Sequence, residues 1–330
     1  MPELKLLTTL WPSFPHFDRF SRDERLAGIR LNSAMISTAE LETELAAIAS
    51  HNGVPLWFDI KGRQLRVAEV IPNTKYLDIR LNHPIHVKTP TPVLFKAGAD
   101  DAELDHLEED GARLIFRGGP NFEVRAGESL HIRHPSLNTR GNLFTSAELV
   151  KIDKVKKAGL RRWFLSYVES ARDVDVFREL VGYDAEVMLK IESKKGLEYV
   201  VRQFKKCDQL TLVAARGDLY VELDRPDQIL EATKLIVTAD PNACVGSRIL
   251  LSVLEGPVPS CADFSELAWL YDIGYRTMML CDELCLKEQL LGRAVNVFEG
   301  FRRSYATTKL TSALQPKPRP WSFFSRWLSS

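Results

Sequence analysis

The amino-acid sequence predicts an α/β protein, a (β/α)8 TIM barrel with a small β-rich domain inserted after the third strand. Eight short apolar segments are each followed by a segment of helical period or by the insertion, and this count favours a closed barrel over an open sheet. Between about residues 67 and 140 the helical period disappears, and short alternating segments are separated by Gly, Pro and Asn. We therefore expect a barrel formed by residues 1–66 and 141–306, an inserted β-rich domain over 67–140, and a tail over 307–330.

The elements of the barrel follow in order along the chain. The first three strands are predicted over 4–10, 29–32 and 55–58, with helices over 20–27 and 39–50 between them. Ser37 or Thr38 offers a cap for the second helix. After the insertion, apolar runs that predict strands cover 162–168, 185–193, 210–219, 243–247 and 275–280. The remaining helices are expected over 147–158, 172–181, 193–206, 225–238, 248–254, 263–272 and 288–304.

Charged side chains follow two neighbouring apolar runs. The first run ends with Lys190 and Glu192, and the second ends with Arg216 and Asp218. Because ligands of α/β folds bind at the carboxyl ends of parallel strands, we expect these side chains at the ligand-binding edge of the sheet. Glu192 and Asp218 could there hold one hard divalent cation, with Lys190 beside it. The alternative is a surface ion pair followed by an ordinary turn, and the spacing alone leaves both interpretations open.

The composition excludes several classes of function. The 330 residues include 44 basic and 44 acidic side chains, so no overall field attracts the protein to nucleic acid or to an anionic membrane. The five cysteines form no Cys-x-x-Cys pair, and their odd number argues against a disulfide framework. The sequence has no leader pattern and no apolar run of about 18 residues. We therefore expect a cytoplasmic protein without a transmembrane segment. The sequence leaves its oligomeric state open, and a homo-oligomer is one of the possibilities.

Other polar or aromatic features receive no catalytic role. The pairs His83/His86 and His131/His134 have spacings possible for metal ligands, but no thiolate or acidic motif accompanies them, so no metal is expected there. Glu283 is interpreted as either a supporting or a structural acid. The acidic stretch 100–110 is interpreted as a solvated face.

The prolines of 315–320 precede an aromatic cluster over 321–328, which is expected to dock on the barrel or, alternatively, to bind a partner or a membrane surface.

Two segments closely resemble the paired signatures of the pyruvate kinase family. They contain Lys-Ile-Glu at 190–192 and Ala-Arg-Gly-Asp at 215–218. Residues 27–32, 58–66 and 278–283 more weakly resemble the family's second, third and eighth strands, in the same order. The similarity covers about residues 4–304 and implies a barrel with a lid domain that binds phosphoenolpyruvate and a metal ion. Only the tail follows the barrel in place of the family's usual C-terminal regulatory domain, so allostery of the usual type is not expected.

The resemblance also implies roles for individual residues. Glu192 and Asp218 would bind Mg²⁺ or Mn²⁺, since carboxylates completed by substrate and water suit such an ion. Lys190 would lie against the transferring phosphoryl group, and Arg30 and Arg66 would bind phosphate oxygens.

On the opposite side of the substrate, backbone N–H groups of Gly217 and Asp218 would hold its carboxylate. Ser247 stands where the family has a threonine near the substrate, and it keeps the hydroxyl group. Lys190, Arg30 and Ser247 would then be the catalytic residues.

The sequence departs from the family on the side of the monovalent cation and the nucleotide. Asn32 and Asp59 fall where the family holds the monovalent cation, but Ala34 replaces a serine that helps to hold it. Gln64 replaces an acid linked to dependence on that cation, which argues against activation by K⁺. Met35 replaces a histidine on the nucleotide side.

Three functional hypotheses remain open. The first is phosphoryl transfer between phosphoenolpyruvate and ADP, a transferase reaction that gives pyruvate and ATP. The second is a lyase or aldolase-like enzyme that stabilises a pyruvate enolate on the same barrel, which the altered nucleotide side would suit. The third is a non-catalytic barrel that acts as a binding module. The intact charged set argues against the third hypothesis, because a lapsed site has no physical need to retain buried charges.

Overall fold

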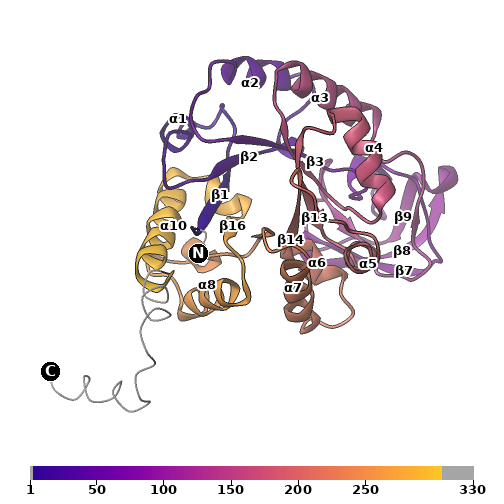
Figure 1. The fold of residues 1–330 in the computed structure, drawn as a ribbon. Coiled ribbons are helices and arrows are strands. Elements are labelled where there is room, and N and C mark those ends of the chain that lie inside the picture. The colour runs from indigo at the N-terminus through magenta and orange to yellow at the C-terminus, as the bar shows by residue number, and fades with distance from the viewer. Residues whose placement is uncertain (1–2, 307–330) are drawn as a thin grey trace, which may run out of the picture.

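Eight parallel strands form a closed barrel in the computed structural model, which describes residues 3–306 (Figure 1). Each strand pairs with the next along the chain, and the last pairs with the first. The strands are β1 (Lys5–Thr9), β2 (Gly28–Asn32), β3 (Leu56–Ile60), β12 (Arg162–Leu165), β13 (Glu186–Ile191), β14 (Leu210–Ala215), β15 (Cys244–Gly246) and β16 (Thr277–Met279). The predicted fold, a (β/α)8 barrel with an inserted β-rich domain after the third strand, is confirmed.

Helices cover the outside of the barrel. They are α1 (Phe17–Phe20), α2 (Leu41–Ala47), α3 (Ser146–Lys157), α4 (Ala171–Val181), α5 (Lys194–Arg202), α6 (Arg216–Glu222), α7 (Gln228–Ala239), α8 (Cys261–Ile273), α9 (Asp282–Cys285) and α10 (Glu288–Phe301). Short helical turns occupy η1 (Ser33–Met35), η4 (Leu251–Leu254) and η5 (Arg302–Ala306). Within residues 3–306, none of these helices combines the length and the apolar character needed to cross a bilayer.

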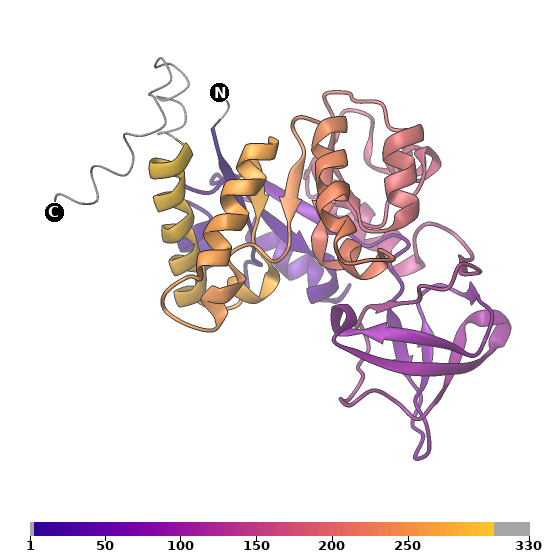
Figure 2. The same cartoon turned by 90° about the horizontal axis from the view of Figure 1, so that it is seen from below.

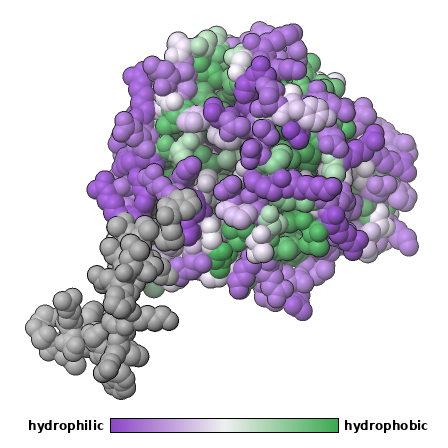
Figure 3. All heavy atoms as spheres, in the orientation of Figure 1, coloured by the Kyte–Doolittle hydropathy of each residue, from purple (hydrophilic) through white to green (hydrophobic). Residues whose placement is uncertain are grey.

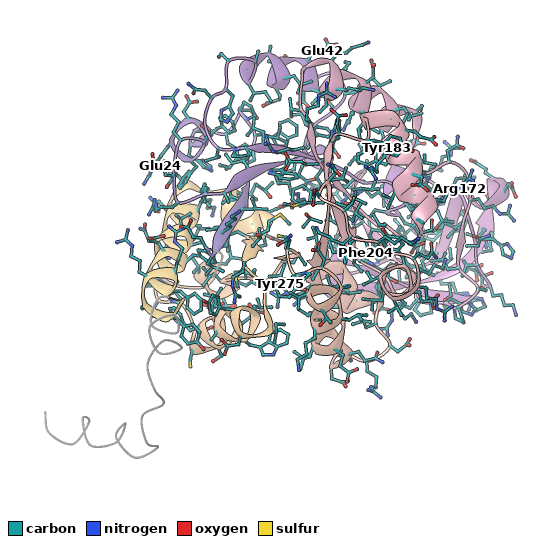
Figure 4. The ribbon with its side chains drawn as sticks, in the orientation of Figure 1. Glu24, Glu42, Arg172, Tyr183, Phe204 and Tyr275 are labelled. Carbon is teal, nitrogen blue, oxygen red and sulfur yellow. The ribbon has the colours of Figure 1, made fainter. Side chains whose placement is uncertain are left out.

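Two apolar layers lie on either side of the strands. Outward-facing strand side chains pack with the helices in one large core, which includes the fully buried Tyr275. In Figure 4 the labelled Tyr275 lies within the molecule, whereas Glu24 and Glu42 lie at its outer surface. Inward-facing side chains form a smaller interior cluster of Leu7, Trp57, Phe164, Met188, Val213, Cys244 and Met279. This interior cluster fills the barrel, so polar side chains gather only at the ends of the strands.

The inserted domain has a sheet and a core of its own. Its six-stranded antiparallel sheet has the order β10-β7-β8-β9-β5-β4, and a two-stranded sheet lies beside it. The strands are β4 (Val67–Val70), β5 (Asp78–Leu81), β6 (Ile85–His86), β7 (Thr91–Phe95), β8 (Asp100–Glu108), β9 (Arg113–Arg117), β10 (Leu130–His131) and β11 (Asn138–Thr139), with turns η2 (Lys96–Gly98) and η3 (Glu109–Gly111). Figure 2 shows this domain projecting from one side of the barrel. The division of the chain at residues 66/67 and 140/141 stays our proposal.

Two predicted helices differ from the observed ones. The helix expected over 20–27 is instead α1, because Asp23 accepts hydrogen bonds from the backbone and the guanidinium group of Arg25 and so stabilises a turn there. The helix expected over 248–254 begins only at Leu251, since Arg248 and Leu250 have left-handed φ angles of 64° and 55°. The predicted acidic face over 100–110 is largely strand β8, and the predicted tail lies outside the described residues.

Candidate active site

A cavity of about 400 Å³ opens at the carboxyl ends of the barrel strands. Eight of the nine site residues predicted from the sequence line it, namely Arg30, Asn32, Arg66, Lys190, Glu192, Gly217, Asp218 and Ser247. The ninth, Asp59, is fully buried below the cavity, where its carboxylate contacts Arg30. The space-filling view shows mainly hydrophilic side chains on the face drawn, with smaller apolar areas between them (Figure 3). The structure therefore brings the predicted residues together, while their roles stay predictions.

Strand β13 and the cap of the helix that follows it fix the position of Lys190 and Glu192. The side chain of Ser193 accepts a hydrogen bond from the backbone N–H of Gly196 and caps α5, and the strand ends at Ile191, just before Glu192. Both Lys190 and Glu192 are buried, and Lys190 Nζ lies 2.8 Å from Glu192 Oε1. Lys190 Nζ also donates a hydrogen bond of 2.9 Å to Ser166 Oγ.

The ammonium group of Lys190 stays charged at neutral pH. Burial alone would lower its pKa, but the carboxylates of Asp59 and Glu192 outweigh this effect and raise the pKa above its ordinary value. A buried cation held among carboxylates is suited to stabilise negative charge on a substrate.

The carboxyl groups of Glu192 and Asp218 are close enough to affect each other's ionisation. Burial, with the neighbouring charge of Asp218, raises the pKa of Glu192 to about 7, although Lys190 opposes the shift. Partial burial would also raise the pKa of Asp218, but the hydrogen bond and charge of His131 hold it well below the ordinary value. Two carboxyl groups held this close together favour a cation between them.

The donor set fits Mg²⁺ bound partly by substrate. Glu192 and Asp218 offer hard oxygen ligands, which Mg²⁺ prefers, and this ion commonly completes its coordination with phosphate oxygens and water. Within residues 3–306, no group of three or more His, Cys, Asp or Glu side chains is arranged to hold a metal by itself. The protein therefore supplies two carboxylates rather than a closed metal cage.

The side chains predicted for a monovalent cation are already engaged with other groups. Asp59 Oδ2 lies 2.8 Å from Arg30 Nε and 2.8 Å from Lys61 Nζ. The carbonyl oxygen of the Asn32 side chain accepts the N–H of Ala34, and its amide group donates to Asp282 Oδ2 at 2.8 Å. The side chains of Arg30 and Lys61 thus already occupy the carboxylate of Asp59, and we assign no K⁺ to these residues.

Comparison with known proteins shows what the chain is similar to. No family model matches it. It is 25% identical to a pyruvate kinase of Thermoplasma acidophilum over 298 residues, which cover 84% of this chain and 54% of that protein. It is 25% identical to a pyruvate kinase of Methanocaldococcus jannaschii over 302 residues, covering 86% of this chain and 65% of that protein. The chain is a relative of the pyruvate kinases.

A solved structure supports the shared fold. The crystal structure of pyruvate kinase from Pyrobaculum aerophilum superposes with a TM-score of 0.69 at 18% identity, covering 91% of this chain and 73% of that chain. The chain spans only 54% and 65% of the length of the two curated relatives above, so their activity comes to it as a proposal.

This pyruvate kinase relative has a site histidine that sequence reasoning set aside. His131 comes from strand β10 of the inserted domain, and its Nδ1 lies 2.8 Å from Glu222 Oε1 and 3.1 Å from the hydroxyl group of Tyr167. Its Nε2 lies 3.4 Å from Asp218 Oδ1. Burial opposes protonation, but Asp218 and Glu222 outweigh it and raise the pKa of His131 to about 9. The inserted domain therefore contributes a positive charge next to a proposed metal ligand.

Asp282 is a second site residue that was not predicted. It is the first residue of α9, shortly after the end of β16 at Met279, and it lines the cavity. Its Oδ1 lies 3.0 Å from Arg30 Nη1 and its Oδ2 accepts from Asn32. The sequence offered a signal, since Asp282 lies within the segment that resembles the eighth strand of the family. Arg30 is therefore held between two carboxylates, Asp59 and Asp282.

Proposed function

We propose that the protein is a Mg²⁺-dependent transferase that moves a phosphoryl group between phosphoenolpyruvate and ADP, giving pyruvate and ATP. The observation that supports this most strongly is the convergence of Lys190, Glu192 and Asp218 in one cavity that Arg30 and Arg66 also line. Phosphoryl transfer depends mostly on positioning and on charge stabilisation, and it requires no protein nucleophile.

In this proposal, cationic side chains bind the phosphoryl group. Lys190 lies within the cavity as a charged ammonium group and stabilises the negative charge that spreads over the phosphoryl oxygens. Arg66 points its guanidinium group at neutral acceptors, the side-chain oxygen of Gln64 at 2.7 Å and the carbonyl oxygen of Gly127 at 2.5 Å. Since these partners carry no charge, the charge of Arg66 is available to a phosphate group.

Glu192 and Asp218 would hold the Mg²⁺, which when bound would neutralise charge on the phosphoryl and enolate oxygens. The carboxylate of phosphoenolpyruvate or pyruvate would bind at the start of α6. The backbone N–H groups of Gly217 and Asp218 belong to the first turn of this helix and have no acceptor within it. A Cβ atom at position 217 would lie 3.2 Å from Ser247 Oγ. Glycine at this position therefore leaves room for the carboxylate to approach the backbone N–H groups. We also propose a cytoplasmic location, which the five free cysteines support.

One observation favours a second candidate, an enzyme that stabilises a pyruvate enolate for another reaction. Asp282 already neutralises part of the charge of Arg30, which weakens the side of the cavity proposed for phosphate. Lys190, Glu192 and Asp218 would serve an enolate equally well, because an enolate oxygen also needs positive charge beside it.

The test is to incubate the protein with Mg²⁺, phosphoenolpyruvate and ADP and to measure pyruvate and ATP. Lys190→Met should lower kcat by a factor of about 100 or more, because it removes a positive charge aimed at the transition state. Lys157→Met is the matched control, since that lysine is exposed on α3 and forms a surface ion pair with Asp153. Both variants are checked for an unchanged melting temperature.

The outcomes separate the candidates. Wild-type turnover that persists in Lys190→Met contradicts the role of this lysine. Metal-dependent exchange of the methyl protons of pyruvate without any ATP supports the enolate enzyme. Neither reaction, together with no binding of pyruvate or metal, leaves the binding module.

A further inference from the structure

Arg248 differs from the three buried cations that line the cavity. Arg30, Lys61 and Lys190 are buried and each pairs with at least one carboxylate. Arg248 is exposed, and within residues 3–306 no ion pair to a carboxylate is found for it. Its guanidinium group lies over the ring of Tyr220, with 5.1 Å between the guanidinium carbon and the ring centroid. A stacked guanidinium group keeps its edge free for an anion.

The backbone around Arg248 is strained and firmly held. Ser247 and Arg248 have φ angles of 68° and 64°, two consecutive left-handed residues with side chains. Arg216 holds this segment, because its Nη2 donates to the carbonyl oxygen of Ser247 at 2.8 Å and its Nη1 lies 2.7 Å from Glu266 Oε1. Strained backbone that the surrounding structure holds in place is typical of ligand sites, where it fixes the direction of a side chain.

The segment also has a defined place relative to the proposed substrate. Ser247 Oγ lies next to Gly217, at the end of the cavity assigned above to the carboxylate of the acid. Strand β15, which leads to Arg248, pairs with β14, whereas Arg30 lies in β2 and Arg66 follows β3, elsewhere around the barrel. Arg248 therefore faces the carbon end of the acid rather than its phosphoryl end.

We propose that Arg248 binds a second anionic group at the carbon end of the cavity, so that the protein also takes a 2-oxo diacid and binds it more tightly than a 2-oxo monoacid of equal length. The inference rests on the proposed function in one respect, because the inference and the proposed function both require an enol or 2-oxo acid to bind in this cavity. A distal carboxylate accepts two hydrogen bonds from the guanidinium edge, while Tyr220 supports the other face of that group.

The test compares two acids of equal length that differ only at the far end. In the presence of Mg²⁺, dissociation constants are measured by calorimetry for 2-oxoglutarate, which carries a distal carboxylate, and for 2-oxovalerate, which carries a methyl group there. The wild-type protein should prefer the diacid, and Arg248→Gln should reduce this preference about tenfold, the value of one charged hydrogen bond. Binding of 2-oxovalerate should not change.

Two further variants keep the test decisive. Arg248→Lys retains the charge and should keep part of the preference. Arg202→Gln, at the far end of α5 from the cavity, should keep all of it. Because the preference compares two ligands on the same sample, an unfolded fraction changes both constants equally.

Several results overturn the inference. They are an equal affinity of the wild-type protein for both acids, no binding of either acid, and a preference that Arg248→Gln leaves intact. A loss confined to ADP binding also overturns it, since the second anion would then belong to the nucleotide. Phosphoenolpyruvate and ADP turnover is measured on the same samples. Absence of ATP with the preference intact refutes the phosphotransferase and leaves the role of Arg248 standing.

Discussion

Asp282 determines how much positive charge the cavity offers to a phosphate group. Arg30 has two acidic partners, and only one of them, Asp59, is fully buried. The side chain of Asp282 is 29% exposed and lines the cavity, so its carboxylate lies where an anionic ligand of Arg30 would approach. An anion that binds Arg30 must therefore compete with this carboxylate.

Replacing Asp282 should strengthen phosphate binding. In Asp282→Asn, one negative charge 3.0 Å from Arg30 is removed while the side chain keeps its shape. We expect the dissociation constant of phosphoenolpyruvate to fall about tenfold, in line with roughly 1.4 kcal/mol for the loss of a competing charge. The measurement is calorimetric titration with phosphoenolpyruvate in the presence of Mg²⁺.

A neighbouring acid provides the control for this prediction. Glu283 also lines the cavity, but no contact of it with Arg30 is found among residues 3–306. Glu283→Gln should change the affinity only slightly. An equal gain in both variants would mean that overall charge, not the contact with Arg30, limits binding.

The strand end that carries Lys190 and Glu192 could be predicted because it belongs to a continuous local pattern. Lys190 and Glu192 end an apolar run and are followed by a helix cap, Ser193, so their place on the barrel edge follows from neighbours in the sequence. The helix α6 (Arg216–Glu222) was missed because its first four residues, 216–219, were assigned to the preceding strand run. Its N-terminus has no side-chain cap among the described residues that would have indicated the boundary.

His131 could not be predicted, because nothing near it in the sequence carries its partners. It contacts Glu222, 91 residues later, and Tyr167, 36 residues later. Only the docking of the inserted domain on α6 brings these residues together, and such a contact leaves no periodic pattern. The hydrogen bond from Arg133 to the carbonyl oxygen of Leu223, at 2.6 Å, belongs to the same docking contact.

His131 should hold strand β10 against the barrel. In His131→Gln, the charged contacts to Glu222 and Asp218 are lost, at a cost of about 1–3 kcal/mol. We expect faster amide hydrogen exchange in β10 and α6, measured by mass spectrometry, with unchanged protection of β13 and β14. The control is His134→Gln, because the imidazole of His134 bonds to the nearby Ser136 of the same domain. Unchanged exchange in β10 would show that this contact does not hold the domain in place.

At the scale of the whole molecule, the barrel and the inserted domain each have an apolar core of their own. The barrel core and the core of the inserted domain share no residue, and the polar docking contact at α6 lies between the two parts. The amino-acid composition does not change at the boundary between these two parts, but the hydrophobic pattern changes there from a helical to an alternating period. This change allowed the insertion to be predicted. It carries no information on the contacts between the inserted domain and the barrel.

Two cores predict two units of local stability. Phe95 in the inserted domain and Phe58 in the barrel are both fully buried, so Phe→Ala at either position should cost about 3–5 kcal/mol. We expect Phe95→Ala to speed hydrogen exchange in β7, β8 and β9 only, because its contacts end within that core. Phe58→Ala should speed exchange in the barrel strands β3 and β12. Equal acceleration of the barrel strands by Phe95→Ala would show that the chain unfolds as one unit, and the inserted domain would then be too strongly coupled to the barrel to move as a lid.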